Sequence, residues 1–274
     1  MKIGVCVSHA QEDIRKAFQN VKDLGLDNCQ LLSWNPALWT DEQAELIKDA
    51  LKETGVEITA FWCGWTGPQA WNFYDGQETL GLVPPTYRFH RVRELMNGSD
   101  FAKKLGVKDV VTHMGFIPEN PLDSNYRGLI VAIRSVAQHC ASNGQNLLFE
   151  TGQETPVTLL RAIQDIGTDN LGVNLDPANL ILYGKANPVD AMETIGKYVR
   201  GVHGKDGKYP TDGHNLGQET PIGQGRVDFK KLIKLLAENG YDGSITIERE
   251  ITGDEQTRDI LAGKKYLEDI INNL

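Results

Sequence analysis

The segment Asn146-Leu147-Leu148-Phe149-Glu150, which continues into Thr151-Gly152-Gln153-Glu154, decides the fold of this chain. A short apolar run that ends in a carboxylate and a glycine is typical of a buried strand whose last side chain faces a cavity. The pattern recurs in three later segments, Leu171–Asp176, Tyr198–His203 and Ser244–Glu248. Four successive predicted strands therefore each carry a metal-type ligand at the C-terminal end.

The rest of the chain repeats the same alternation of short apolar runs and longer amphipathic ones. Four earlier strands are predicted over Ile3–Val7, Cys29–Leu32, Glu57–Cys63 and Val107–His113. Apolar residues at helical spacing predict helices over Glu12–Leu24, Asp41–Glu53, Tyr87–Leu105, Tyr126–Cys140, Val157–Ile166, Val189–Ile195, Asp228–Glu238 and Gln256–Leu274. Asp41 is expected to cap its helix. Gly64–Pro85 and the glycine-rich segment Gly204–Arg226 are predicted to be irregular loops.

Eight βα units in a row favour parallel strand pairing and closure into a (β/α)₈ TIM barrel. The alternative is an open doubly wound sheet, which would normally carry a glycine-rich phosphate turn after its first strand. Here that turn is Ser8-His9-Ala10-Gln11, without such a motif. No linker or low-complexity segment divides the chain, so residues 1–274 are expected to form a single domain.

Composition excludes some classes of partner. Of the 274 residues, 40% are hydrophobic and 24% charged, which suits a soluble globular protein, and the formal net charge is −9. Because sequence-independent binding to nucleic acid needs clustered lysines and arginines, no nucleic-acid partner is expected. No apolar stretch is long enough to span a membrane. Four widely spaced cysteines, Cys6, Cys29, Cys63 and Cys140, indicate reduced, buried thiols and a cytoplasmic protein. Assembly into a homo-oligomer is left open.

The four ligand-type residues are expected to share one rim of the barrel. Glu150, Asp176 and His203 are spaced at close to one βα unit of roughly 30 residues, and Glu248 follows after a unit enlarged by the glycine-rich loop. Three carboxylates brought together would repel one another unless a cation shares them. Oxygen-rich ligation with one imidazole suits one divalent ion, with Mn²⁺ expected and Mg²⁺, Co²⁺ or Zn²⁺ as alternatives. Taken singly, each residue could instead be a helix cap, an ion-pair partner or a wall residue.

The motifs around these residues resemble the sugar phosphate isomerase/epimerase family, within the xylose-isomerase-like TIM barrel superfamily. They are Glu-Thr-Gly-Gln-Glu (150–154), Asp-Pro-Ala-Asn-Leu (176–180), His-Gly-Lys-Asp (203–206), Pro-Ile-Gly-Gln-Gly (221–225) and Thr-Ile-Glu-Arg-Glu (246–250). The resemblance covers nearly the whole chain and is specific for the superfamily, not for a substrate. It implies that Glu150, Asp176, His203 and Glu248 bind one divalent cation and that the two glutamates also transfer protons.

The chemistry of these residues fits an isomerase or epimerase of a small keto-sugar, sugar phosphate or related hydroxy-carbonyl compound. A metal ion that binds the carbonyl and the adjacent hydroxyl oxygen would stabilise an enediolate. Glu150 and Glu248 would remove and return the proton as base and acid. Loss of a β-hydroxyl from the same enediolate would instead make the protein a keto-sugar lyase or dehydratase.

Several neighbouring residues are substrate-binding candidates. His113 ends the fourth predicted strand, and Lys205 lies two residues past His203, on the same side of an extended backbone. Gln153 and Glu154 could bond sugar hydroxyls or cap the next helix. Among the five tryptophans, Trp62 and Trp65 lie nearest a strand end, where they could stack on a sugar or pack within a loop.

Some positions depart from the familiar pattern of the family. Many ketose epimerases have a histidine where this chain has Asn179, which we keep as a substrate-binding candidate. They have a glutamate at the position of Pro156 and an arginine at that of Tyr209, so the usual free-ketose contacts are missing. A zinc apurinic endonuclease would need further histidines, one of them at position 179. A non-catalytic sugar-binding barrel is a further alternative, but the intact set of ligands argues against it.

Overall fold

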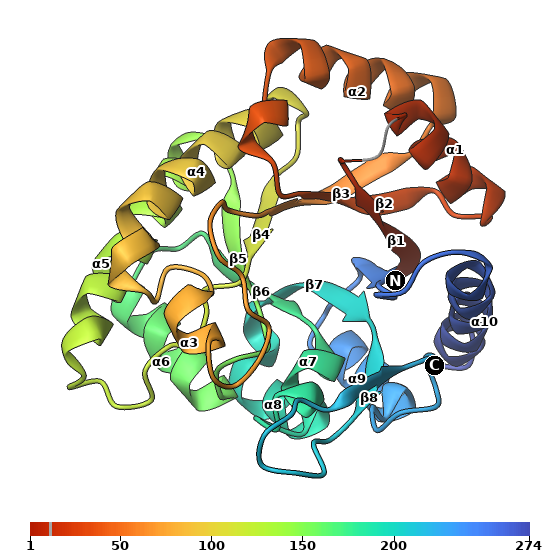
Figure 1. Ribbon diagram of the computed structural model, residues 1–274. Helices are drawn as coiled ribbons and strands as arrows, with labels where there is room; N and C mark the ends of the chain where they lie inside the picture. The colour runs from red at the N-terminus through yellow and green to blue at the C-terminus, as the bar shows by residue number, and fades with distance from the viewer. Residues whose placement is uncertain (11–12) are drawn as a thin grey trace.

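The protein is described by a computed structural model that covers residues 1–10 and 13–274. Within these residues, eight parallel strands close into a barrel in the order β1-β10-β7-β6-β5-β4-β3-β2 (Figure 1). The strands are β1 (Lys2–Ser8), β2 (Asn28–Ser33), β3 (Glu57–Cys63), β4 (Asp109–Thr112), β5 (Asn146–Glu150), β6 (Leu171–Leu175), β7 (Val199–Gly204) and β10 (Ser244–Ile247). The predicted (β/α)₈ barrel is confirmed.

Helices surround the barrel. They are α1 (Ile14–Asp23), α2 (Asp41–Thr54), α3 (Gly76–Thr79), α4 (Pro85–Lys104), α5 (Ser124–Ser142), α6 (Pro156–Ile166), α7 (Pro177–Leu182), α8 (Pro188–Ile195), α9 (Phe229–Glu238) and α10 (Asp254–Ile271), with short 3₁₀ turns η1 (Pro36–Leu38) and η2 (Gly196–Tyr198). Their buried stripes, such as Phe18 of α1 and Leu232 of α9, pack with outward-facing strand residues in one core. Each predicted helix is present, although the expected start at Glu12 lies outside the described residues.

The cap of α2 differs from the sequence prediction. The side chain of Thr40, not Asp41, accepts a hydrogen bond from the backbone N–H of Gln43. Asp41 is the first residue of the helix, where its negative charge favours the positive end of the helix dipole. A threonine before an aspartate satisfies the same cap preference, and the sequence offered no ground for choosing between the two.

The predicted loop Gly204–Arg226 contains regular structure that the sequence prediction missed. Strands β8 (Asp206–Lys208) and β9 (Gln218–Thr220) pair antiparallel within it. The Asp206 carboxylate accepts hydrogen bonds from the backbone N–H groups of Gly223, Gly225 and Val227 at 2.9, 2.9 and 3.1 Å. Gly225 is required there, because a Cβ at this position would lie 2.1 Å from Asp206 Oδ1. The buried Asp206 carboxylate thus joins the end of this segment, at residues 223–227, to its start next to β7.

The remaining structural expectations are met in part. Cys29, Cys63 and Cys140 are buried and Cys6 is half-buried, and all four thiols are free. Among the helices that the structure describes, none has the length and apolar character needed to cross a membrane. The irregular segment Gly64–Pro85 is a loop that includes the short helix α3.

Candidate metal centre

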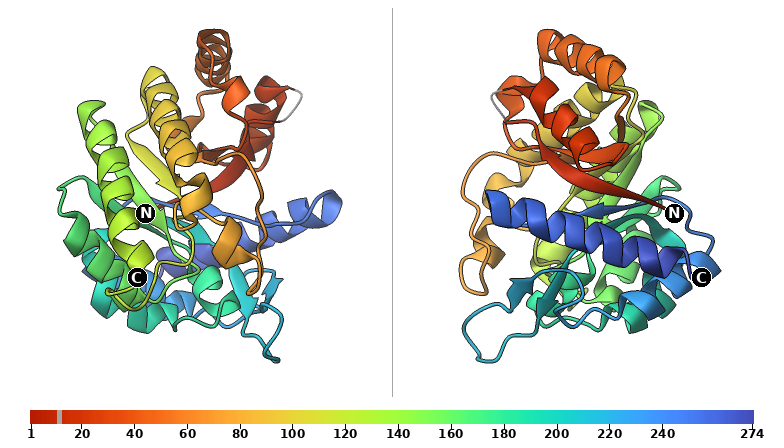
Figure 2. Two further views of the ribbon diagram at one scale, coloured as in Figure 1. Left: turned by 60° about the vertical axis from the view of Figure 1, so that its left-hand side comes forward. Right: turned by 90° about the vertical axis from the view of Figure 1, so that its right-hand side faces the viewer.

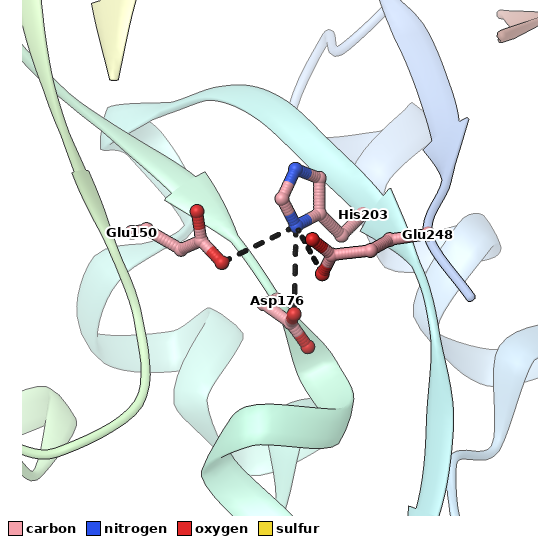
Figure 3. Close-up of side chains that lie close together, drawn as sticks. All are labelled: Glu150, Asp176, His203 and Glu248. Carbon is pink, nitrogen blue, oxygen red and sulfur yellow. Dashed lines mark hydrogen bonds and ion pairs between the residues drawn. The ribbon is translucent and has the colours of Figure 1, made fainter. Parts of the chain in front are cut away.

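Glu150, Asp176, His203 and Glu248 meet at the C-terminal end of the barrel strands. Glu150 ends β5, His203 lies near the end of β7, and Asp176 and Glu248 directly follow β6 and β10. One ligand atom from each residue lies within 4.8 Å of the others. His203 Nδ1 is 3.4 Å from Glu150 Oε1, 3.4 Å from Asp176 Oδ2 and 3.3 Å from Glu248 Oε2 (Figure 3). The strand-end pattern in the sequence therefore corresponds to one compact cluster.

Local structure fixes the Asp176 carboxylate. Asp176 is the N-cap of α7, and its Oδ1 accepts a hydrogen bond from the backbone N–H of Asn179 at 2.8 Å. Pro177 at the first helical position suits this cap, because its fixed φ matches a helix start. Thr151 Oγ1 accepts from the Asp176 N–H and donates to its carbonyl oxygen at 2.8 and 2.9 Å. The other carboxylate oxygen, Oδ2, is left facing His203.

The opposite nitrogen of His203 is held from inside the barrel. His203 Nε2 lies 2.9 Å from Gln30 Oε1, and Gln30 Nε2 donates to Asn174 Oδ1 at 2.9 Å. Because an amide oxygen can only accept, Nε2 carries a proton and donates it to Gln30. Burial lowers the pKa of His203, but Glu150, Glu248 and Asp176 outweigh it and hold the pKa well above its usual value, so Nδ1 also carries a proton and faces the three carboxylates. A divalent cation would displace this proton and take the Nδ1 lone pair. A hydrogen bond that fixes the tautomer in this way is typical of metal-binding histidines.

The carboxylate of Glu150 is buried and contacts three polar side chains. Trp62 Nε1 donates to Glu150 Oε2, Asn179 Nδ2 donates to Oε1 at 3.3 Å, and His113 Nε2 lies 3.3 Å from the same oxygen. Burial raises the pKa of the Glu150 carboxyl, but the charges of His203 and His113 outweigh it and hold the pKa well below its usual range. Glu150 is therefore ionised at neutral pH.

Glu248 is paired with a buried lysine. Lys205 Nζ lies 2.9 Å from Glu248 Oε2, 2.6 Å from Glu250 Oε1 and 3.7 Å from Asp176 Oδ2. Burial raises the pKa of Glu248, but Lys205 and His203 outweigh it and lower the pKa to about 2. The predicted orientation of Lys205 is correct, since its side chain is 2% exposed and turned toward the same cluster as His203.

Two residues of the cluster, Glu150 and Glu248, line a cavity of about 390 Å³. One wall is aromatic and includes Trp34, Trp62 and Trp71, with Trp34 and Trp62 ring centroids 4.6 Å apart. A Cβ at position 64 would lie 2.5 Å from the Trp34 ring, so Gly64 permits this packing. Trp65 does not line the cavity, because it is buried behind the aromatic wall. Its ring centroid lies 5.3 Å from that of Trp34 and 6.2 Å from that of Trp62.

The other wall carries polar groups that lack partners. Gln153 lines the cavity, and neither its amide nitrogen nor its amide oxygen has a hydrogen-bond partner among the described residues. His113 Nδ1 and Glu154 Oε1 are likewise buried and have no hydrogen-bond partner among the described residues. Burial raises the pKa of Glu154 to about 7. Asn179 and His113 also line the cavity, whereas Glu154 lies buried just behind it.

Sequence reasoning missed several residues of this site. Trp34 and Trp71 lie on the cavity although Trp65 was preferred, and Glu250 binds Lys205. Glu250 could have been found, since it lies two residues past Glu248 on an extended segment. Gln30 carries no such signal, because a lone glutamine in an apolar strand is commonly an interior residue whose hydrogen bonds are made by neighbouring groups. Leu182 and Tyr183 lie at the C-terminal end of α7, a short helix that the sequence did not predict, and Leu216 lies in the loop between β8 and β9.

These features define a TIM barrel with a candidate site for a divalent cation at the C-terminal ends of its strands. The chain belongs to the xylose isomerase-like TIM barrel family, whose model matches residues 18–270. A xylose isomerase domain protein from Planctomyces limnophilus has a similar structure, with 33% identity, a TM-score of 0.92 and coverage of 99% of this chain and 98% of that one. A D-tagatose 3-epimerase-like protein shares the fold at 22% identity, with a TM-score of 0.76 and coverage of 99% and 97%.

Curated relatives match shorter stretches. An uncharacterised protein from Methanocaldococcus jannaschii is 31% identical over 193 residues, which are 66% of this chain and 62% of that protein. An inosose dehydratase from Clostridium botulinum is 26% identical over 133 residues, 43% of this chain and 45% of the relative. The chain therefore matches about three-fifths of the first relative and less than half of the second.

Proposed function

We propose that this protein is a divalent-metal-dependent isomerase or epimerase of a small keto-sugar or related hydroxy-carbonyl compound. The observation that carries the proposal is the convergence of Glu150, Asp176, His203 and Glu248 beside the cavity that Glu150 and Glu248 line. The similarity to a D-tagatose 3-epimerase-like fold agrees with it.

The donor set fits a cation of this kind. Three carboxylates provide hard oxygen ligands and the Nδ1 lone pair of His203 provides one nitrogen, a combination that suits Mn²⁺, with Mg²⁺, Co²⁺ and Zn²⁺ as alternatives. A divalent charge would also relieve the mutual repulsion of the three carboxylates. All four residues are held by neighbouring groups, so little reorganisation would be needed for binding.

The two glutamates are the proton-transfer groups in this proposal. A bound divalent ion would supply Lewis-acid polarisation of the substrate carbonyl, which makes the neighbouring C–H proton more acidic. Glu150 and Glu248 flank His203 from opposite sides (Figure 3) and both have a lowered pKa, so either carboxylate can accept a proton. Return of the proton to the opposite face of the same carbon gives epimerisation, and return to the adjacent carbon gives isomerisation.

The cavity walls indicate how a sugar would be held. The faces of Trp34 and Trp62 offer an apolar surface for the C–H face of a sugar ring. On the other side, Gln153 offers a donor and an acceptor that have no protein partner, and His113 Nδ1 offers a third polar atom. Buried polar groups without partners cost free energy, so these groups are well suited to substrate hydroxyls. Trp65 would not contact the sugar, but it would support Trp34 and Trp62 from behind.

The charge of the lining favours an unphosphorylated substrate. The charged carboxylates that line the cavity are Glu150, Glu248 and Glu250. Lys205 is nearby, but its ammonium group is already paired with two of them. Beyond the metal ligands, Glu250 and Lys205 form an ion pair, so this pair offers a phosphate no free cation. We therefore propose a neutral keto-sugar, in preference to a sugar phosphate.

A dehydratase or lyase is the second candidate. Lys205 places a buried ammonium group 2.9 Å from Glu248, where together they could protonate a departing β-hydroxyl. The partial similarity to an inosose dehydratase favours the same chemistry. Both candidates begin with removal of a proton next to a carbonyl.

Solvent deuterium exchange tests the proposal. The Mn²⁺-loaded protein should incorporate deuterium from D₂O next to the carbonyl of at least one member of a panel of free ketoses, ketose phosphates, inososes and keto-glycosides, as followed by NMR. Exchange with retention of all hydroxyls identifies an epimerase or isomerase, whereas loss of water identifies the dehydratase. If no substrate exchanges with any of the four metals, the proposal is wrong.

A further inference from the structure

A second cavity, of about 690 Å³, adjoins the candidate metal centre. It shares three lining residues with the first cavity, namely Leu32, Glu248 and Glu250. Its remaining lining comes from β1, α1, the segment after β10, and α10. Figure 2 shows in its right-hand view that β1 runs between α1 and α10. The second cavity therefore leads from the metal centre toward the groove between these two helices.

The strand pairing explains how the barrel wall opens there. β1 pairs with β10 from Lys2↔Ser244 to Val5↔Ile247, where β10 ends. Beyond that point the Glu248 N–H donates to Gly204 O of β7 at 3.2 Å, while β1 continues to Ser8 alongside β2. The two strands thus separate at the rim. Cys6 alternates with Val5 and Val7 along β1, so the cavity is lined from both sides of that strand.

The outer part of the second cavity is apolar. Val5, Val7, Val21, Leu24 and Ile260 line it, with the half-exposed Leu261 at its edge. Lys264 of α10 donates to the carbonyl oxygens of Leu24 and Gly25 at 3.1 and 2.8 Å and closes the groove toward the C-terminal end of α1.

Its charged groups do not favour an anionic ligand. Arg249 is the cation among the described lining residues, and it is paired with Glu219 at 2.9 Å and Asp259 at 2.8 Å. The other charged lining residues are the carboxylates Asp23, Glu248 and Glu250. The lining also includes uncharged polar side chains, namely Ser8, Asn20, Thr252, Gln256 and Thr257. A group that fits this space is uncharged and can lay an apolar part against the valines, leucines and isoleucine of the groove.

We propose that the substrate is a sugar that carries an uncharged apolar substituent, with the reacting ring at the metal centre and the substituent in the groove between α1 and α10. The inference rests on the proposed function, because it takes the metal centre as the site of the reacting ring. It identifies the substrate as a glycoside-type molecule with an apolar aglycone, in preference to a free monosaccharide.

Calorimetric titration with two non-reacting probes, methyl and hexyl β-D-glucoside, tests this inference on the Mn²⁺-loaded protein. Each fully buried methylene strengthens binding by about fourfold, so the hexyl compound should bind about tenfold more tightly or better. Asn20→Trp, which fills the groove from α1, and Leu261→Glu, which places a carboxylate at its edge, should each reduce this ratio to near one. Both residues are exposed, so the substitutions spare the core. Gln19→Trp, on the same helix but not lining the groove, should keep the ratio.

The outcomes separate the two proposals. A hexyl-to-methyl ratio near one in the wild-type protein overturns the inference, as does a high ratio that survives both groove substitutions, since the chain would then bind elsewhere. Either result is independent of turnover. If free ketoses exchange deuterium but the hexyl-to-methyl ratio is near one, the proposed function holds and the proposal of an apolar substituent is wrong. If the ratio is high and depends on the groove but no substrate exchanges, the groove binds an apolar substituent and the proposed function is wrong.

Discussion

His203 Nε2 lies 2.9 Å from Gln30 Oε1, so a glutamine on β2 sets the tautomer of a histidine on β7, across the barrel. The Gln30 amide is itself oriented by Asn174 on β6. This chain of amides leaves His203 Nδ1 free to act as a ligand. The hydrogen bond is therefore a structural basis for metal affinity that lies outside the four ligands.

Substitution of Gln30 by leucine should weaken Mn²⁺ binding by about 10- to 100-fold, because the imidazole loses the acceptor that fixes its tautomer. Calorimetric titration with Mn²⁺ measures the change. Gln145→Leu is the matched control, since Gln145 is a buried glutamine that bonds Ser99 and Val107 away from the site. If both variants keep wild-type Mn²⁺ affinity, Gln30 has no positioning role.

Glu150→Gln and Glu248→Gln should each reduce turnover by at least ~100-fold, because each removes one of the two groups that transfer the proton. The fold should persist in both, as judged by circular dichroism. The assay is deuterium exchange with the best substrate of the panel, and Glu238→Gln on the exposed face of α9 is the control. Retained exchange in either site variant would overturn its assignment as a proton-transfer group.

The stability of the protein should depend on the protonation of Glu154. Burial raises its pKa to about 7 in the folded state, against an ordinary value of 4.5. The folded state therefore binds this proton more tightly than the unfolded state does. The resulting stability is present below pH 4.5 and is lost as pH rises through about 7, by about 3 kcal/mol in all.

Glu154→Gln should remove this loss, so the variant should gain more stability relative to wild type at pH 8 than at pH 5. Urea unfolding of the metal-free proteins at both pH values provides the comparison. Glu119→Gln, at an exposed carboxylate, should show no such difference. Equal effects of Glu154→Gln at the two pH values would mean that the Glu154 pKa is not raised.

Asp206→Ala should destabilise the loop that forms part of the cavity rim. Asp206 accepts several backbone N–H hydrogen bonds, and their loss should cost roughly 2–4 kcal/mol in the free energy of unfolding. Hydrogen exchange at Gly223–Val227 should accelerate. Asp212→Ala removes an exposed carboxylate from the same loop and should leave those amides protected. Unchanged protection in Asp206→Ala would show that the loop is held by other contacts.

The fold could be predicted because each strand and helix carries its own local signal. Apolar runs that end in Glu150, Asp176, His203 and Glu248 mark strand ends, and parallel strands bring their C-terminal ends to one rim. The ligand cluster then follows from topology alone. The sequence prediction of the fold erred at the cap of α2, where Thr40 and Asp41 offered the same chemistry, and in the Gly204–Arg226 segment, where it missed the β8–β9 hairpin.

The substrate side of the site was harder to predict, since it is built from loops. Trp34 and Trp71 come from segments whose course depends on tertiary packing, and Leu216 lies in the loop between β8 and β9. Gln30 has a role only in relation to His203, which lies far away in sequence. Such contacts have no local signature, so the ligand cluster was predicted better than the lining of the cavity.

The most direct test of the central claim is the stoichiometry of metal binding. Protein stripped with a chelator and dialysed to equilibrium against Mn²⁺ should retain one ion per chain, and Asp176→Ala should retain none under the same conditions. A wild-type protein that binds no Mn²⁺, Mg²⁺, Co²⁺ or Zn²⁺, or that binds one ion regardless of Asp176, would contradict the account.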